Sequence, residues 1–311
     1  MKTTFRFLIL FSLVIILGSA NAGINWHNQV GKWAEPNKWS GNIVPDGQDE
    51  VLIRNEGSKC ILDSDAGDWD IAQRLRVYGN ALLAIEDGAS LLGVSWMRVG
   101  TNEGPGNVTQ TGGQVRLKGG KDGAKLTIGY ESGSQGSQYT IKGGTITYLN
   151  SDAYLIVGYR GGEGKFTVVG TSPEIKMKRL YVGGDLIEKA GTGIMEFQVD
   201  SKGVSPVQIT NSIHIDREGN NSQADLIINS IAAPPKTNIV LIENTGSGYV
   251  DGRFDTLVDS NGSKPAAEGS EVILKHDETE YKYILTYRHN AGQDGYSNDI
   301  ALIYEQELAK N

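Results

Sequence analysis

The sequence is nearly devoid of cysteine: Cys60 is the single one among 311 residues. An intramolecular disulfide is therefore excluded, and the fold must be held by packing and backbone hydrogen bonds. Secreted domains depend on disulfides mainly when they are small, and about 290 residues are enough to bury a sizeable core as one long domain or two short ones. Cys60 lies in the strand-like segment Lys59-Cys60-Ile61-Leu62, which predicts a buried and inert thiol.

Helical periodicity is missing as well. No segment of helical length places apolar residues at i, i+3, i+4 and i+7. The chain has 8 prolines and 41 glycines, and glycine-rich punctuation between short β-branched runs is typical of many strands joined by tight turns. These features predict an all-β protein.

Positive charge is in deficit. The chain carries 29 Lys and Arg against 37 Asp and Glu, a formal net charge of −8. Without Lys2 and Arg6 the balance is 27 against 37, which is −10. Proteins that bind nucleic acid need a basic face, so the composition predicts no nucleic-acid partner.

Long apolar runs are confined to the N-terminus. Lys2 and Arg6 precede an uncharged apolar run over residues 7–17, and the small residues 18–22 end in Asn21-Ala22. This order is typical of a secretory signal peptide, and the run is too short for a transmembrane helix of about 20 residues. We expect a signal peptide over residues 1–22, a mature chain without a membrane span, and a secreted, cell-surface or periplasmic location.

The middle of the chain repeats itself. An aliphatic–glycine step recurs as Val99-Gly100, Ile128-Gly129, Val157-Gly158 and Val182-Gly183, at spacings of 29, 29 and 25 residues. Periods of 20 to 50 residues indicate solenoids and arrays. Because alternate side chains of a strand point to opposite faces, each copy supplies an inward aliphatic pair. Stacked copies then share one core, and the glycines suit corners that require positive φ or close backbone approach.

These repeats predict a right-handed parallel β-helix rather than a propeller or a sandwich, since aromatic blade signatures are absent. Residues 23–74 contain Trp26, Trp33, Trp39 and Trp69 and are predicted to form an aromatic N-terminal cap over the otherwise unpaired strand edges. Residues 75–215 are assigned to the β-helix repeats. Residues 216–311 form either irregular terminal β coils with a cap or a small β-sandwich.

Several phrases of the sequence resemble one family. They are residues 39–51 (WSGNIVPDGQDEV), the Val/Ile-Gly steps with the phrase TQTGGQV, residues 203–209, residues 242–246 and residues 294–300. Together they resemble the secreted β-helical repeat proteins of planctomycete-type bacteria, which are similar to autotransporter-associated β-strand repeat and exosortase-sorted extracellular proteins. The resemblance implies export and a β-helical architecture, and it implies little about chemistry.

Sequence motifs for catalysis are absent. The chain has no G-x-S-x-G elbow, no H-E-x-x-H motif and no P-loop. The four histidines, His27, His214, His276 and His289, lack the paired spacing of metal ligands. The acidic segment 294–299 lacks the spacing of a calcium loop and is predicted to be a turn before a strand. We therefore expect no catalytic residue, no metal ligand and no cofactor.

A polysaccharide lyase is the one enzyme class for which residues can be assembled. Such a site needs carboxylates that hold Ca²⁺ and a Lys or Arg base beside them. The candidates are Lys176, Lys178, Arg179, Asp152, Glu163 and Asp185. Alternation places Lys176 and Lys178 outward around Met177, which is also the pattern of an ordinary solvated face, and we favour that interpretation.

A glycan-binding site is predicted from Tyr130 and Tyr159. Each tyrosine directly follows a repeated glycine, so stacking of the rungs aligns the two side chains about 4.8 Å apart along the axis. Aromatic faces with the polar neighbours Glu131 and Arg160 can bind sugar rings. Alternatively, the two tyrosines pack over the corner loops as structural covers.

Three classes of function therefore remain. The first is a non-enzymatic structural or adhesive protein outside the cell, which predicts no aromatic or carboxylate cluster on a solvent face. The second is a module that binds extracellular polysaccharide or cell-surface components through Tyr130, Glu131, Tyr159 and Arg160. The third is a carbohydrate-active enzyme. We favour the first, with the second as the main alternative.

Overall fold

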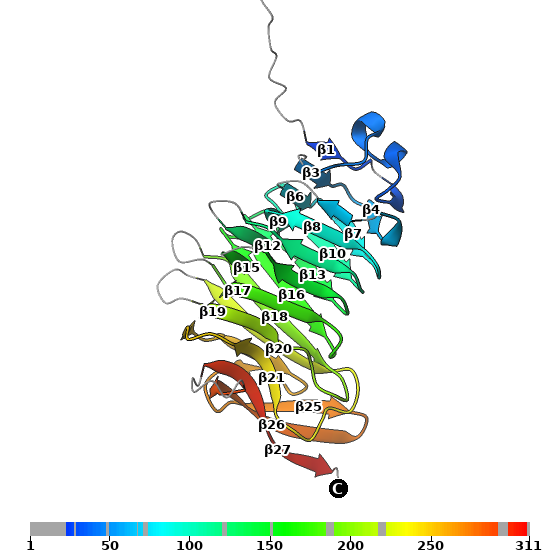
Figure 1. The fold of residues 1–311 in the computed structure, drawn as a ribbon. Helices are drawn as coiled ribbons and strands as arrows, with labels where there is room; N and C mark the ends of the chain where they lie inside the picture. The colour runs from blue at the N-terminus through cyan, green and yellow to red at the C-terminus, as the bar shows by residue number, and fades with distance from the viewer. Residues whose placement is uncertain are drawn as a thin grey trace, which may run out of the picture.

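The chain folds into a parallel β-solenoid of about seven turns. The structure, a computed structural model, describes residues 23–27, 29–47, 50–66, 68–70, 74–119, 123–149, 152–184, 190–216, 222–291 and 298–309. The predicted signal peptide over residues 1–22 lies outside these. Strands stack from the N-terminal end to the C-terminal end of an elongated molecule (Figure 1). The prediction of an all-β, β-helical fold is confirmed.

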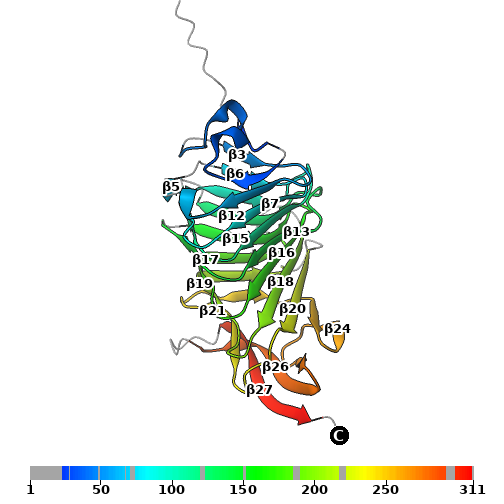
Figure 2. The same ribbon diagram turned by 90° about the vertical axis from the view of Figure 1, so that its right-hand side faces the viewer.

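Each turn of the solenoid has three faces. The first face is a separate ten-stranded sheet, formed by β2 (Val30–Lys32), β4 (Lys59–Leu62), β7 (Ala81–Ile85), β10 (Gly106–Gln110), β13 (Ser137–Ile141), β16 (Glu163–Val169), β18 (Thr192–Val199), β20 (Gln223–Ser230), β23 (Thr256–Asp259) and β24 (Gly262–Pro265). Figure 2 shows β13, β16, β18 and β20 of this face one after another along the axis.

The second and third faces belong to one seventeen-stranded sheet, because two long strands run across both. The second face consists of β5 (Asp68–Asp70), β8 (Ser90–Val94), β11 (Gln114–Leu117), β14 (Thr145–Tyr148) and β21 (Ile239–Asn244). The third face consists of β1 (Ile24–Asn25), β3 (Glu50–Ile53), β6 (Arg74–Val77), β9 (Trp96–Val99), β12 (Ala124–Tyr130), β15 (Ala153–Tyr159) and β22 (Val250–Gly252). The long strands β17 (Glu174–Val182) and β19 (Val207–Ile215) contribute to both faces.

The repeated aliphatic–glycine steps lie above one another, as predicted. Val99, Ile128, Val157 and Val182 are successive register partners in β9, β12, β15 and β17. All four are buried, and so are their inward neighbours Met97, Leu126, Leu155 and Leu180. Full burial of such a side chain contributes about 1.5–3 kcal/mol, so the stack of like residues forms a continuous core that a single turn lacks.

Two of the repeated glycines show why the corners need this residue. Gly129 and Gly158 both have φ of +74°, a conformation that side chains with a Cβ rarely adopt. A Cβ at Gly158 would lie 2.3 Å from the backbone carbon of Thr192, and one at Gly129 would lie equally close to Glu163. The third face therefore meets the first face at van der Waals distance only because no side chain intervenes.

The N-terminal end is closed by an aromatic cap. The side chains of Trp26, Trp33 and Trp39 are buried, and the ring centres lie 4.8 Å (Trp26–Trp39) and 4.7 Å (Trp33–Trp39) apart in edge-to-face contacts. Trp39 lies between two short 3₁₀ helices, η1 (Pro36–Lys38) and η2 (Ser40–Asn42), and η3 (Ser64–Ala66) follows β4. Parallel pairing starts with β1–β3 and β2–β4, before residue 75.

The C-terminal end is closed by antiparallel strands. Parallel pairing continues past residue 215 to β23, and β24 then turns back on β23. The strands β25 (Glu271–His276), β26 (Thr279–His289) and β27 (Asp299–Ala309) form an antiparallel sheet that joins the second face through β21. Asp299 begins β27, and its carboxylate accepts hydrogen bonds from the backbone N of Asn244 (2.8 Å) and Ala291 (2.6 Å).

Two further features of the described residues bear on the predictions. Cys60 is buried in the core, and burial raises the pKa of its thiol well above the ordinary value, as expected of an inert cysteine. Within the described ranges, no helix is long and apolar enough to span a bilayer.

Candidate functional site

The outer surface of the third face carries a regular alternation of cations and aromatic rings. Five successive register partners form it, one from each of β6, β9, β12, β15 and β17: Arg74, Trp96, Lys125, Tyr154 and Arg179. Four of them lie three residues before the repeated valine or isoleucine of their strand, and Arg74 lies three residues before Val77, the register partner of Val99. We call this set the cation–aromatic ladder.

Each cation of the ladder contacts the ring on a neighbouring rung. The guanidinium carbon of Arg74 lies 5.2 Å from the ring centre of Trp96, and the Lys125 ammonium lies 5.4 Å from the same ring. Further along, Lys125 is 5.7 Å and Arg179 is 5.4 Å from the ring centre of Tyr154. Such cation–π contacts contribute about 0.5–1 kcal/mol each at exposed sites, so the ladder orders these long side chains on the surface.

The predicted pair Tyr130 and Tyr159 lies beside this ladder. The two residues are register partners in β12 and β15, with ring centres 5.6 Å apart and ring planes inclined by 42°. Both side chains are half-buried. Arg160 covers the pair, 5.1 Å from the Tyr159 ring centre and 5.7 Å from that of Tyr130, and its Nη1 donates a hydrogen bond of 3.1 Å to the Tyr130 hydroxyl.

Glu131 occupies a different place from its predicted partners. It forms the corner after β12 with φ of +73°, where its backbone N donates to the carbonyl of Tyr159 and its carbonyl accepts from the Ser134 hydroxyl. The side chain does not line the pocket described next. The structure therefore brings Tyr130, Tyr159 and Arg160 together and leaves Glu131 outside.

The two tyrosines border a small pocket, which we call the tyrosine pocket. Its lining consists of Trp96, Arg98, Lys125, Thr127, Tyr130, Ile156, Tyr159 and Arg160. The lining contains three cations and no carboxylate. A cavity volume of about 70 Å³ is far below the roughly 300–1,000 Å³ typical of pockets that enclose a whole ligand. The tyrosine pocket is thus large enough to hold one substituent of a larger ligand, and too small to enclose the whole ligand.

Arg98 is a half-buried cation of this pocket that lies between two aromatic rings. Its guanidinium carbon lies 3.9 Å from the ring centre of Tyr130 and 4.8 Å from that of Trp96. Burial lowers the pKa of the Arg98 guanidinium below its ordinary value. In the described part of the chain, neither Arg98 nor Lys125 has a carboxylate within ion-pair distance. A half-buried charge without a counter-ion is unfavourable, so both groups are disposed to accept an anion.

Sequence reasoning missed Trp96, Arg98, Lys125 and Tyr154. A signal was present, because four of the ladder residues stand three places before the repeated valine or isoleucine. Their chemical types change from rung to rung, however, so a search for like residues at the repeat period does not select them. Only the strand register shows that the alternating types are neighbours.

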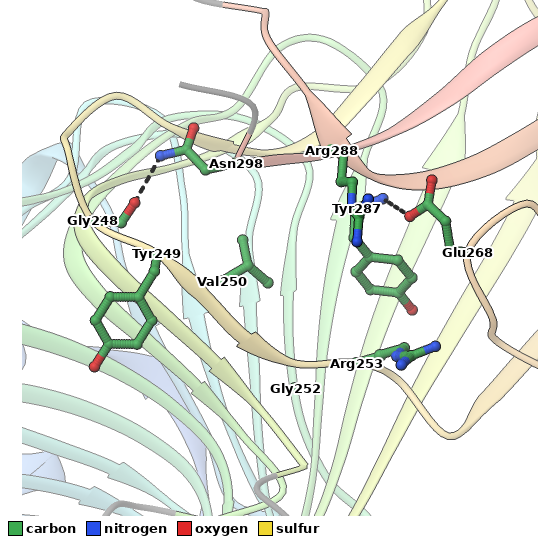
Figure 3. Close-up of a pocket in the computed structure, with 9 residues that line it drawn as sticks. All are labelled: Gly248, Tyr249, Val250, Gly252, Arg253, Glu268, Tyr287, Arg288 and Asn298. Atoms are coloured by element: carbon green, nitrogen blue, oxygen red, sulfur yellow. Dashed lines mark hydrogen bonds between the residues drawn. The ribbon is translucent and has the colours of Figure 1, made fainter. Parts of the chain in front are cut away.

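A larger pocket lies at the C-terminal end (Figure 3). Its cavity volume is about 450 Å³, and its lining includes Tyr249, Arg253, Glu268, Tyr287 and Arg288. The Glu268 carboxylate already accepts hydrogen bonds from Thr286 Oγ1 (2.7 Å) and the backbone N of Tyr287 (2.8 Å). The pocket therefore lies between β22, on the third face, and the closing sheet, away from the tyrosine pair.

A Ser–His–Asp arrangement also occurs on the third face. His214 Nε2 lies 3.0 Å from Ser212 Oγ, and His214 Nδ1 lies 3.4 Å from Asp251 Oδ2. Serine hydrolases use this order of contacts, but here Ser212 and His214 are buried, and the imidazole stacks on Tyr181 with 4.9 Å between ring centres. The adjacent backbone N of Ile213 donates to the Tyr249 carbonyl. The arrangement thus satisfies a buried histidine.

The lyase candidates converge only in part. Asp152 lies 2.9 Å from Lys178 and 3.9 Å from Arg179, whereas Lys176 pairs with its neighbour Glu174 at 2.7 Å. Glu163 belongs to β16 on the first face, and Asp185 lies outside the described residues. Within the described ranges, no group of three or more His, Cys, Asp or Glu side chains is placed to hold a metal ion.

Comparison with known proteins adds no relative: no family model, curated protein or solved structure matches the chain.

Proposed function

We propose that this protein is a non-enzymatic β-solenoid that is exported, serves as a structural or adhesive component, and binds polysaccharide through its third face. The observation that carries the proposal is the register of the outward side chains. Tyr130 and Tyr159 are paired on adjacent rungs, next to the cation–aromatic ladder. A purely structural role predicts no aromatic cluster on a solvent face.

The chemistry of these residues suits a carbohydrate ligand. Aromatic rings offer apolar surface to the C–H face of a sugar, while the tyrosine hydroxyl and the indole N–H are polar handles for its hydroxyls. Because β-solenoids are stacks of similar turns, equivalent groups recur at the strand spacing of about 4.8 Å. A polymer of repeated sugar units is therefore a better match than a single small molecule.

The proposal of export comes from the N-terminal sequence alone. Residues 1–22 have the order of basic, apolar and small residues that a signal peptidase recognises. Expression of the full chain in a bacterial host and N-terminal sequencing of the product from the medium or periplasm tests it. We expect a mature N-terminus near Gly23, whereas an unprocessed chain that stays in the cytoplasm would refute export.

Polysaccharide binding is tested by affinity electrophoresis of the mature protein in gels that contain different soluble polysaccharides. The variant Tyr159→Ala removes one ring of the pair. We expect it to weaken the affinity derived from the retardation about tenfold, since loss of a stacked ring costs on the order of 1.4 kcal/mol. Tyr148→Ala is the matched control, because Tyr148 is a half-buried tyrosine on the second face whose hydroxyl contacts Thr210.

Two outcomes contradict the proposal. In one, none of the polysaccharides retards the wild-type protein. In the other, Tyr148→Ala weakens retardation as much as Tyr159→Ala does, which places binding elsewhere on the solenoid. Thermal unfolding of each variant shows whether the fold has been kept.

A further inference from the structure

The charge of the tyrosine pocket is opposite to that of the whole chain. The protein has a formal net charge of −8, yet the pocket lining contains Arg98, Lys125 and Arg160 and no acidic residue. Net charge governs long-range attraction, whereas the local sign of a pocket governs which group it accepts. A cationic pocket on an acidic protein indicates selection for a particular anionic group.

Carboxylates on the third face lie to either side of this pocket. Glu50 forms an ion pair of 2.7 Å with Arg76 in β6, and Asp152 pairs with Lys178 and Arg179 of β17. The rungs of β9 and β12 lie between these pairs (Figure 1). In the described part of the chain, no carboxylate lies within ion-pair distance of Arg98 or Lys125, and the two cations between them contact the rings of Trp96, Tyr130 and Tyr154. The carboxylate of Glu131 acts on Arg98 only from beyond that distance.

We propose that the polysaccharide is acidic and that its carboxylate or sulfate groups bind in the tyrosine pocket, against Arg98 and Lys125. This inference rests on the proposed function and names its ligand class. An anionic substituent would accept charge-assisted hydrogen bonds from the two cations, which are stronger than neutral ones. The sugar ring that bears it would lie against Tyr130, Tyr159 or Trp96, so one sugar unit uses both kinds of contact.

The ladder also sets the direction of the polymer. Arg74, Lys125 and Arg179 lie on alternate rungs along the solenoid axis, with Trp96 and Tyr154 between them. A chain that follows the axis meets a cation on every second rung, about 9–10 Å apart at the usual strand spacing. A chain that runs parallel to the strands would meet one rung only.

Single-stranded nucleic acid is the competing polyanion, because it too binds to cations and aromatic rings. Its binding requires a basic groove that follows many phosphates. Here the cationic region is short and ends at the ion pairs of Glu50 and Asp152. The third face therefore favours an acidic polysaccharide.

The test compares two ligands that share one backbone, polygalacturonate and its fully methyl-esterified form, with a sulfated polysaccharide as a third arm. Isothermal titration calorimetry measures the affinity of each polymer for the mature wild-type protein and for the variants Arg98→Gln and Lys125→Gln. Lys142→Gln is the control, since Lys142 is an exposed lysine on the turn after β13. A thymidine oligonucleotide of similar charge is the competitor.

We expect the wild type to bind at least one acidic polymer about tenfold more tightly than the methyl ester, and the preference to fall as salt rises. Either pocket substitution should remove most of that preference while Lys142→Gln keeps it. Comparison of the carboxylated and sulfated polymers identifies the anionic group.

Other results overturn the inference. Equal affinity for the acid and the ester refutes an acidic ligand while polysaccharide binding stands. If no polysaccharide binds, the proposed function fails as well. If the oligonucleotide binds as tightly as the best acidic polymer and both pocket substitutions weaken it, the third face is a general polyanion surface and the inference is wrong.

Discussion

Arg98 stacks on Tyr130, with 3.9 Å between the guanidinium carbon and the ring centre, although the two residues belong to successive strands of the third face. Among the described residues of the third face, this is the closest cation–π contact. It joins the cation–aromatic ladder to the predicted tyrosine pair. The enclosed cation and the half-buried ring together form one wall of the tyrosine pocket.

Arg98 is expected to serve binding more than stability. Arg98→Met removes cation–π contacts worth about 0.5–1 kcal/mol each, but it also relieves a half-buried charge that has no ion-pair partner among the described residues. The free energy of unfolding in urea should therefore change by less than about 1 kcal/mol. A loss above about 2 kcal/mol would show that Arg98 is mainly structural.

The corner glycine Gly158 is expected to be indispensable for the fold. Gly158→Ala introduces a Cβ at φ of +74° and 2.3 Å from the Thr192 backbone, so it should destabilise the protein by about 3 kcal/mol or more. Gly136 has φ of +82° with open space around it, so Gly136→Ala should cost only about 1–2 kcal/mol. Equal losses in denaturant unfolding would argue against close packing at this corner.

The phenol of Tyr139 supports the core through one buried hydrogen bond. Its hydroxyl donates to Gln110 Oε1 at 2.6 Å, and the Gln110 amide nitrogen in turn contacts the carbonyls of Gly113 and Thr145. Tyr139→Phe leaves a buried acceptor without its donor, at a cost of about 1–3 kcal/mol. Tyr148→Phe, at the surface of the second face, should change the unfolding free energy by less than about 0.5 kcal/mol.

Glu196 is expected to make stability depend on pH. Burial raises the pKa of its carboxyl, but the hydrogen bonds from Gln198 and Thr167 and the charge of Lys165 outweigh burial, so the folded-state pKa lies below the ordinary value. The stabilisation is present above the unfolded pKa, about 4.3, and is lost as pH falls through the folded-state value. Glu196→Gln should flatten the decline of unfolding free energy below about pH 4.

The matched control for this pH effect is Glu174→Gln. Glu174 is exposed and pairs with Lys176, an arrangement that contributes little to stability. The acid decline of the Glu174 variant should follow that of the wild type. If the unfolding free energy of Glu196→Gln falls as steeply below about pH 4 as that of the wild type and of Glu174→Gln, the Glu196 carboxylate is not a source of the pH dependence.

The sequence alone determined the solenoid and its register. One turn cannot bury its apolar residues by itself, so successive repeats must stack and share one interior. The residues that share it are Val99, Ile128, Val157 and Val182. The adjacent glycines follow from the same geometry, since corners demand positive φ. The pairing of Tyr130 with Tyr159 was predictable for this reason, as both follow the repeated step.

Only the tertiary structure decided which outward side chains meet. Glu131 and Arg160 occupy equivalent corner positions and both have positive φ, yet Arg160 lies over the tyrosines and Glu131 does not line the pocket. Ladder neighbours such as Trp96 and Lys125 share no residue type, so no repeat in the sequence marks them. Inward positions obey a common packing rule, whereas outward positions depend on contacts between rungs that the period does not encode.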